Sequence, residues 1–420
     1  MATVSALGGI GRAFANRSFR LYFLGLAAAT SGFWASRVAL AWIVWELTHS
    51  PTWLGLIAFV EVVPMIALGF IGGTVVDRTG SLRVARLMQI GWACVMIAFA
   101  TVILTGVATK EILLVIVFVE GMIAGFSNPS QLALVAKLLP RDDLSAAVAL
   151  QSFVVQTGRF VGPAVVGPLL AMTGPGPVFA VVTLCFVWSA TMLCIITTNE
   201  PEEIKRGTSG FMADFVEGFR YTLDHFAIRT IILYTAVMAI LLRPIVDLLP
   251  GFADTVFGRG AEGLAWLMAA FGLGSIVSAI HIAFRGETKG LTRVFILNLA
   301  IGTASLLAFA LTTDFWIALA LTVVMGMSTN TVSIVSQTLA QHMVAGHMRA
   351  RVMSILGMSF RAVPAVGALA QGWAQSLFGL SGPIVVAAAL CMLAWVRLVH
   401  ITRTRNLAHQ AERRQSEYLE

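Results

Sequence analysis

About twelve long apolar segments, almost free of charged side chains, limit what this chain can fold into. A helix needs about 20 apolar residues to cross a hydrocarbon core of roughly 30 Å, and each segment is long enough. Only 12% of the 420 residues are Asp, Glu, Lys or Arg, against about 25% in a soluble domain. Because lipid offers a backbone no hydrogen bonds, the segments are predicted to be helices. The predicted fold class is an all-α membrane protein with twelve transmembrane helices in two pseudo-repeated six-helix lobes.

The order of the segments divides the chain into four parts. The predicted spans are residues 19–47, 52–76, 84–108, 111–138, 144–172 and 177–198, followed by 227–250, 261–284, 291–312, 314–343, 349–378 and 381–402. The N-terminal lobe is therefore predicted at 1–198, the linker at 199–226, the C-terminal lobe at 227–402 and a tail at 403–420.

The linker carries an amphipathic pattern, in which four phenylalanines mark one face: Phe211, Phe215, Phe219 and Phe226. Such a helix is expected to lie flat on the membrane surface and to connect the lobes. A target helix for a calmodulin-like partner is the alternative.

Lysine and arginine are distributed unequally between the two sets of loops. One set holds basic residues near 12–17, 78–86, 137–141, 205–206, 285–293, 349–351 and 403–405, and the opposite set holds Lys110 and Arg259. Cytoplasmic loops usually carry such an excess of basic residues, so both termini are expected on the cytoplasmic side of a bacterial-type inner membrane. The net charge of +7 then reflects loops that face anionic lipid, and no nucleic-acid partner is expected.

Two stretches half a chain apart are similar. G-F-S-N-P at 125–129 has a counterpart in G-M-S-T-N at 326–330, and a helix with a central arginine follows each, at Arg159 and Arg361. Six helices, a linker and six repeated helices are typical of a two-lobed transporter.

The loop at 72–83 reads G-G-T-V-V-D-R-T-G-S-L-R and resembles motif A of the major facilitator superfamily. The matching residues are Gly73, Asp77, Arg78, Gly80 and Arg83, while Ser81 replaces a basic residue. The resemblance implies a cytoplasmic latch in which Asp77 faces the N-terminus of a helix in the opposite lobe. An ordinary basic turn is the alternative.

The segment at 158–168, G-R-F-V-G-P-A-V-V-G-P, resembles motif C, which is associated with exporters that run as antiporters. The matching residues are Gly158, Gly162, Pro163 and Gly167. Close packing of helices on a small-residue face is the alternative interpretation.

Longer stretches resemble the enterobactin-exporter-like, or transmembrane secretion effector, branch of the same superfamily. They are 16–25, 39–55, 126–135, 139–150 and 269–274. The resemblance implies two lobes that rock about a midplane cavity, and relatives that export siderophores, drugs or other small amphipathic molecules.

Seven charged residues lie at membrane depth in the predicted spans, where each costs roughly 2.5–3.5 kcal/mol and is expected to pair and to face a cavity. They are Arg37, Glu61, Glu120, Arg159, Arg243, Asp247 and Arg361. For Glu61 and Glu120, a proton-carrier role competes with static pairing to Arg37 or Arg159. Arg243 and Asp247 are expected to pair as i and i+4 on one helix, with a structural, gating or substrate-contacting role.

Arg361 has Asp247 as its one obvious acidic partner in the second half and is the better candidate for contacting a negative group of a substrate. We expect Arg159 and Arg361 to occupy equivalent places in the two lobes.

Uncharged polar residues in the spans either line a path or make interhelical hydrogen bonds. They include Asn128, Gln156, Asn330 and Gln337. Trp34, Trp42, Trp45 and Trp53 are expected to anchor helices at the membrane interface, and Trp34 is also a candidate for stacking on a substrate.

The sequence contains no G-x-x-x-x-G-K-[ST] motif and no Cys/His spacing typical of a metal site. We therefore expect no cofactor, no metal and no enzymatic activity. The predicted function is proton-coupled export of a small amphipathic organic molecule, siderophore or drug-like, by a monomer in contact with membrane lipids. The alternatives are a flippase for lysophospholipid or another lipid-like substrate and a non-transporting sensor or enzyme.

Overall fold

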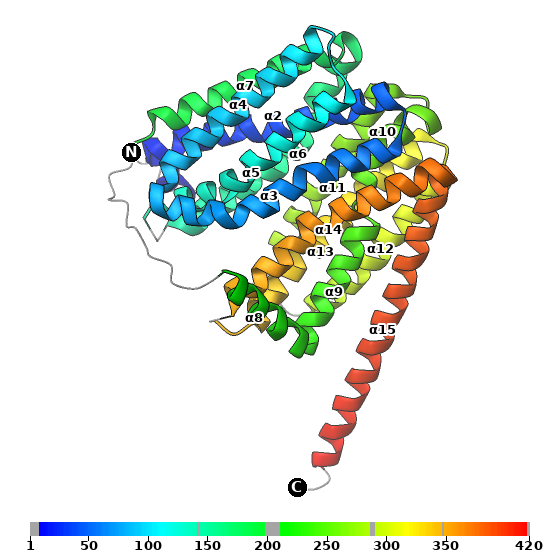
Figure 1. Cartoon of the computed structure of the whole chain (residues 1–420). Helices are drawn as coiled ribbons and strands as arrows, with labels where there is room; N and C mark the ends of the chain where they lie inside the picture. The colour runs from blue at the N-terminus through cyan, green and yellow to red at the C-terminus, as the bar shows by residue number, and fades with distance from the viewer. Residues whose placement is uncertain (1–7, 141–142, 198–210, 286–289, 347, 418–420) are drawn as a thin grey trace.

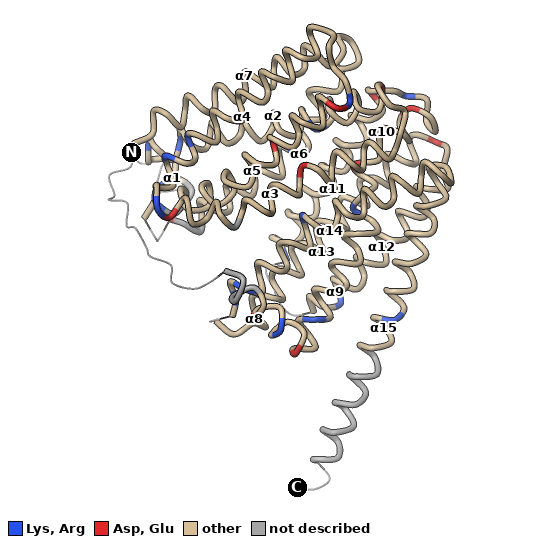
Figure 2. Tube along the Cα trace, viewed as in Figure 1, with Lys and Arg blue, Asp and Glu red and all other residues tan. Residues whose placement is uncertain are grey.

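The computed structural model describes residues 8–140, 143–197, 211–285, 290–346 and 348–417, and the regular elements in these ranges are all helices. Twelve helices of the described chain are long and apolar enough to cross a membrane. The predicted fold class is confirmed. Figure 2 shows most of the tube inside the bundle in tan, with charged positions at the helix ends and a few near the middle.

The first half begins with a short helix, α1 (Gly8–Ala15), which precedes six spans. These are α2 (Arg17–Thr48), α3 (Pro51–Thr79), α4 (Ser81–Leu104), α5 (Lys110–Leu138), α6 (Leu144–Thr173) and α7 (Pro175–Ile195). In the second half α8 (Phe211–Asp224) precedes the spans. These are α9 (Phe226–Leu241) with α10 (Ile245–Gly251) and a π-helical turn (Phe252–Val256), then α11 (Gly260–Arg285), α12 (Leu291–Leu311), α13 (Phe315–Met343), α14 (Arg349–Phe378) and α15 (Ser381–Glu417).

Local chemistry fixes several helix ends. The Asp314 carboxylate accepts hydrogen bonds from the backbone N–H groups of Trp316 and Ile317, at 2.8 and 2.9 Å, and so caps α13. Gly80 has a φ of 95°, which a side chain would disfavour, and it allows the direct turn from α3 into α4.

Two predicted boundaries are wrong. The span predicted at 227–250 is interrupted, because Pro244 cannot donate a backbone hydrogen bond and α9 ends at Leu241. Phe226 begins α9 and does not belong to the amphipathic helix α8, which ends at Asp224. The last span is predicted at 381–402, and the membrane-spanning part of α15 has these bounds; the helix itself continues as far as Glu417 and projects away from the bundle in Figure 1. The linker residues 198–210 lie outside the described chain.

The two halves repeat each other, although in a different register from the one predicted. Helices α5 and α13 each have 29 residues, and α6 and α14 each have 30. Gln131 donates to the hydroxyl of Ser127 at 3.1 Å, and Gln337 donates to Ser333 at 3.2 Å. Ser127 therefore corresponds to Ser333 rather than to Ser328, and the predicted register is wrong by five residues.

A smaller offset, of three residues, separates Arg159 from Arg361. Arg159 lies fifteen residues after Leu144, the first residue of α6, whereas Arg361 lies twelve residues after Arg349, the first residue of α14. The two arginines are thus offset by nearly one helical turn and are not equivalent.

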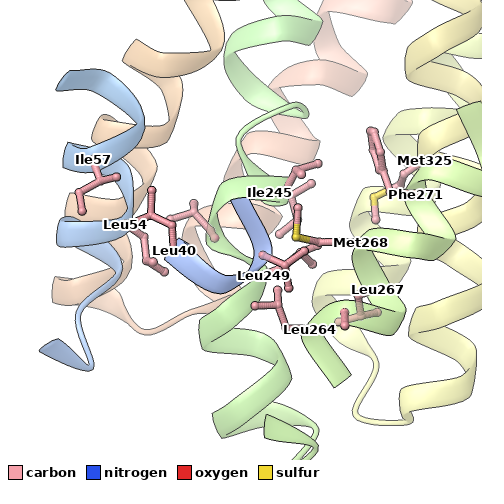
Figure 3. Close-up of a cluster of buried hydrophobic side chains, with 14 of the residues drawn as sticks. Leu40, Leu54, Ile57, Ile245, Leu249, Leu264, Leu267, Met268, Phe271 and Met325 are labelled. Carbon is pink, nitrogen blue, oxygen red and sulfur yellow. The ribbon is translucent and has the colours of Figure 1, made fainter. Parts of the chain in front are cut away.

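The hydrophobic core is continuous at one end of the molecule and divided at the other. We call the end with the α2–α3 loop at 49–50 the sealed end, and the end with the Gly80 turn the open end. One buried cluster contains residues of both halves, and Figure 3 shows Leu40, Leu54 and Ile57 on one side of it and Ile245, Leu249 and Met268 on the other. Toward the open end each half has its own smaller cluster, around Leu138 in the first half and Val352 in the second. In Figure 1 the halves accordingly diverge toward α1 and α8.

Glycines bring the halves into backbone contact at the sealed end. A Cβ atom added at Gly55 of α3 would lie 2.2 Å from the carbonyl oxygen of Ala368 in α14, and one at Gly372 would lie 2.4 Å from that of Pro51. The indole N–H of Trp45 also donates to the carboxylate of Asp254 in the other half, at 2.9 Å. The sealed end therefore depends on residues that leave no room for a methyl group.

Gly55→Ala is expected to disfavour the sealed state by about 1–3 kcal/mol, the usual cost of overpacking. A cysteine placed at Ile57, in a background in which the four natural cysteines are serine, reports the change by its reaction with membrane-impermeant thiol reagents. Its labelling from the sealed end should rise. Gly357→Ala is the matched control, because nothing lies within 4 Å of a Cβ at Gly357. Equal labelling in both variants would contradict the role of Gly55.

Candidate functional site

A cavity of about 520 Å³ lies between the two halves. Its walls come from α2 to α7 in the first half and from the α9–α10 break, α11 and α14 in the second. The cavity begins beneath the sealed end at Leu54 and Ile57 and reaches toward the open end at Gln131 and Gln151.

Eight of the twelve predicted cavity residues line this space: Trp34, Arg37, Glu61, Asn128, Arg159, Arg243, Asp247 and Arg361. The other four lie elsewhere. Glu120 is buried behind the wall, Gln156 and Asn330 bond to each other, and Gln337 bonds along its own helix to Ser333.

The guanidinium group of Arg37 interacts with all three acidic side chains at membrane depth. It forms an ion pair with Glu61, which joins α2 to α3. It also interacts electrostatically with Glu120 of α5 and with Asp247 of the opposite half. Glu61 therefore pairs with Arg37, and no ion pair joins Glu61 or Glu120 to Arg159, the other partner considered, in the described chain.

Glu120 is 1% exposed, and its Oε2 atom has no hydrogen-bond partner among the described residues. An added Cβ at the adjacent Gly121 would lie 2.1 Å from the carbonyl oxygen of Glu61, so α3 and α5 are in backbone contact next to Glu120. The Glu120 carboxyl group is thus held beside the Arg37–Glu61 pair and does not line the cavity.

The other three arginines gather on a different part of the cavity wall. The guanidinium carbon of Arg159 lies 4.9 Å from the centre of the Trp34 ring, and that of Arg243 lies 5.5 Å from the centre of the Phe271 ring. Arg159 experiences the like charges of Arg243 and Arg361. Within the described residues, none of the three forms an ion pair within 4 Å.

The expected pair between Arg243 and Asp247 is wrong. No ion pair within 4 Å connects these two described residues, and the chain between them leaves the helix at Pro244. The i and i+4 geometry that would have paired them is lost with the helix.

Aromatic side chains form an apolar wall that the sequence did not reveal. Trp92 lies edge-on to Phe33, with ring centres 5.8 Å apart, and stacks on Phe186 at 5.4 Å. All three line the cavity together with Trp34. In an apolar span a functional aromatic residue looks the same as a lipid-facing one, so no pattern could have found them. Trp45 was likewise expected to be an interface anchor, whereas its hydrogen bond to Asp254 helps to close the sealed end.

Gln156 and Asn330 join the halves below the cavity. The Gln156 amide donates to the Asn330 side-chain oxygen at 2.8 Å, and the Asn330 amide donates to the carbonyl oxygen of Ser275 at 2.9 Å. The sequence left open whether these residues line a path or make interhelical hydrogen bonds, and both of them make interhelical hydrogen bonds.

The motif at 73–83 lies at the open end, and no hydrogen bond or ion pair joins it to the other half among the described residues. Asp77, Arg78 and Arg83 are exposed, and Asp77 forms no ion pair with the described residues. Nothing lies within 4 Å of a Cβ at Gly73. At the start of α14 in the other half, Arg351 instead pairs with Glu217 of α8 at 2.8 Å.

The glycine motif in α6 serves both halves. Added Cβ atoms at Gly158 and Gly162 would each lie 2.6 Å from an atom of α2, in Thr30 and Ser31, and one at Gly167 would lie 2.3 Å from Ala265 of α11. Pro163 lies within the continuous helix. At these three positions a larger side chain would collide with a neighbouring helix, so the glycines allow the helices to pack closely.

The profile of the transmembrane secretion effector family matches residues 12–419. The chain belongs to this family. It is 22% identical over 357 residues to the staphyloferrin A transporter of Staphylococcus aureus, with 83% of this chain and 87% of the relative covered. It is 21% identical over 383 residues to the multidrug efflux pump Tap of Mycolicibacterium fortuitum, with 88% and 92% covered.

Solved transporters share the fold. The nucleoside transporter NupG superposes with a TM-score of 0.69 at 11% identity, over 92% of this chain and 98% of its own. A bacterial homologue of the human lysosomal transporter Spinster, in an inward-facing and occupied conformation, gives 0.69 at 16% identity, over 93% and 97%. The protein is thus a multi-pass membrane transporter of the major facilitator superfamily, and its relatives are transporters rather than enzymes.

Arg37→Gln is expected to destabilise the protein more than Glu61→Gln. Removing Arg37 leaves Glu61 and Glu120 without their shared cation, which costs about 3–5 kcal/mol for a buried pair, whereas removing Glu61 leaves Arg37 with Glu120 and Asp247. The double variant should recover part of the loss. Thermal unfolding in detergent measures all three, and a smaller loss for Arg37→Gln would contradict the central position of Arg37.

Asp77→Asn is expected to slow the conformational cycle without disturbing the contacts described above, because Asp77 is exposed in this conformation. The substitution would destabilise the opposite conformation, in which the open end is closed and the latch implied by the motif would form. Transport rate and cysteine accessibility from both ends measure it. If neither changes, the latch assignment is wrong.

Proposed function

We propose that the protein exports a small amphipathic organic molecule by alternating access, driven by inward proton flow. The observation that carries this proposal is one cavity between the halves, closed at the sealed end, that combines an aromatic wall with buried charge. Rocking the halves about this cavity would expose the same side chains first to one side of the membrane and then to the other.

We assign the open end to the cytoplasm. The basic residues of the turns at 78–86 and 349–351 belong to this end, and Lys110 and Arg259 belong to the other. Such an excess of basic residues is typical of cytoplasmic loops. The similarity to an inward-facing structure supports the assignment. Both termini then lie in the cytoplasm, and the cavity takes its substrate from there.

Glu61 and Glu120 are the proposed proton carriers. Both share the positive charge of Arg37, and Asp247 of the opposite half also interacts with it. When the halves move, Asp247 would change its distance from Arg37, and the electrostatic interaction of Arg37 with the two carboxyl groups of the first half would change with it. Proton binding and lobe movement are coupled in this way through a single arginine.

The names of the relatives support export of a small molecule. One is a transporter of staphyloferrin A and another a multidrug efflux pump. The glycine pattern Gly158–Gly167 resembles that of antiporters, which agrees with proton exchange. The apolar part of the substrate would lie on the wall of Phe33, Trp92 and Phe186.

Glu120→Gln is expected to abolish coupling to the pH gradient, because the amide cannot carry a proton. Proteoliposomes with an imposed pH gradient and fluorescent amphipathic molecules of negative and zero charge as cargo measure coupled transport. Glu111→Gln is the matched control, since Glu111 is exposed at the start of the same helix. Full coupling in both Glu120→Gln and Glu61→Gln would place the carriers elsewhere, with Asp247 next. Movement of a labelled lysophospholipid without any pH dependence would favour a flippase.

A further inference from the structure

A side pocket of about 90 Å³ opens beside the main cavity within the second half. Helices α9, α11, α13 and α14 form most of its walls. Its uncharged polar groups are the hydroxyls of Thr235, Ser275, Thr329 and Ser333 and the side-chain amide of Asn330, which already bonds to Gln156 and Ser275. Arg159 and Arg243 line both this pocket and the main cavity. The two guanidinium groups therefore stand where the two spaces meet.

Two buried polar atoms at this pocket lack a protein partner. The Nε atom of Arg159 and the Oγ1 atom of Thr235 are buried and form no hydrogen bond with the described residues, and Thr235 is only 1% exposed. Both atoms are hydrogen-bond donors, and buried donors are usually satisfied. A bound group that accepts hydrogen bonds would satisfy both donors.

The charges around the pocket define the sign of that occupant. Arg159 experiences the like charges of Arg243 and Arg361, while Glu61 is paired with Arg37 and also interacts with Arg361. Asp247 interacts with Arg243 electrostatically but does not line the side pocket. Three cations in a low-dielectric space repel one another, and an anion between them removes this repulsion.

The aromatic wall lies across the main cavity in the first half. Arg159 bridges the two regions, because its guanidinium lies over Trp34 while it lines the side pocket. A ligand whose anionic end enters the side pocket would place its apolar body on the side of Phe33 and Trp92. Such a ligand would touch both halves at once.

We propose that the side pocket binds the oxyanion group of an amphipathic organic anion, held by Arg159, Arg243 and Thr235. This inference rests on the proposed function and deepens it, because it names the class of the exported molecule. A carboxylate and a phosphate monoester share this chemistry, since both accept several hydrogen bonds from guanidinium groups.

The test uses the full chain in lipid nanodiscs and three probes with one apolar body: 1-naphthoate, 1-naphthyl phosphate and the neutral 1-naphthamide. Isothermal titration calorimetry gives each dissociation constant. We expect an anionic probe to bind at least about tenfold more tightly than the amide, which corresponds to about 1.4 kcal/mol. The tighter of the two anions identifies the head group as carboxylate or phosphate.

Variants locate the site. Arg159→Gln and Arg243→Gln should each weaken binding of the anion by about tenfold and leave binding of the amide unchanged. Arg159→Lys should retain part of the affinity, and Thr235→Val should cause a smaller loss. Arg259→Gln is the matched control, since Arg259 also lies over aromatic rings, those of Phe315 and Trp316, but lines neither space.

Folding is checked by gel filtration and thermal unfolding, and Arg243→Gln and Thr235→Val carry the test if Arg159→Gln does not fold. Equal binding of all three probes, no binding of either anion, or full anion affinity in Arg243→Gln would overturn the inference. Proton-driven efflux of a neutral amphiphile would survive that outcome and keep the proposed function. Conversely, anion binding that depends on Arg243 without any pH-driven transport would keep the site and reject the proposed function.

Discussion

The cost of placing charge inside a membrane organises this protein. Seven charged side chains lie within the spans, and the structure brings six of them to one cavity and the seventh, Glu120, directly behind its wall. The carboxylates converge on Arg37, while Asp247 also interacts with Arg243 and Glu61 with Arg361, and Arg159 experiences the like charges of the other two arginines. Since α2, α3, α5, α6, the α9–α10 break and α14 each supply members, the two halves cannot change their relative position without changing these interactions.

The broken helix illustrates how backbone and charge act together. Pro244 ends the hydrogen-bonding pattern of α9, so Arg243 leaves the helical register that Asp247 would have shared with it. Arg243 then lines the side pocket, and Asp247 interacts electrostatically with Arg37. In a continuous helix, Arg243 and Asp247 could have formed an ion pair with each other. Breaks of this kind in transporter helices commonly lie at binding sites.

The sequence predicted the fold class well because length and hydropathy determine membrane spans with few alternatives. It also identified the charged residues of the cavity, since a charged side chain is rare in an apolar span unless it serves a function there. It failed where three-dimensional pairing mattered. Spacing along a helix suggested that Arg243 pairs with Asp247, and short similar stretches suggested the wrong register for the repeat. The aromatic wall, the side pocket and the Trp45–Asp254 bond join segments far apart in the chain, and no local pattern marks them.

The glycines of the sealed end have a consequence for how such proteins diversify. Gly55 and Gly372 contact the opposite half through its backbone, and neither lines the cavity. A change of a single methyl group at these positions would alter the balance between the two facing states and leave the chemistry of the cavity intact. Residues of the aromatic wall such as Trp92 and Phe186, which belong to the first half alone, can in turn vary without altering these glycine contacts. Substrate preference and the resting orientation of the carrier are therefore separately heritable traits, which suits a family whose members retain one fold at about 20% identity.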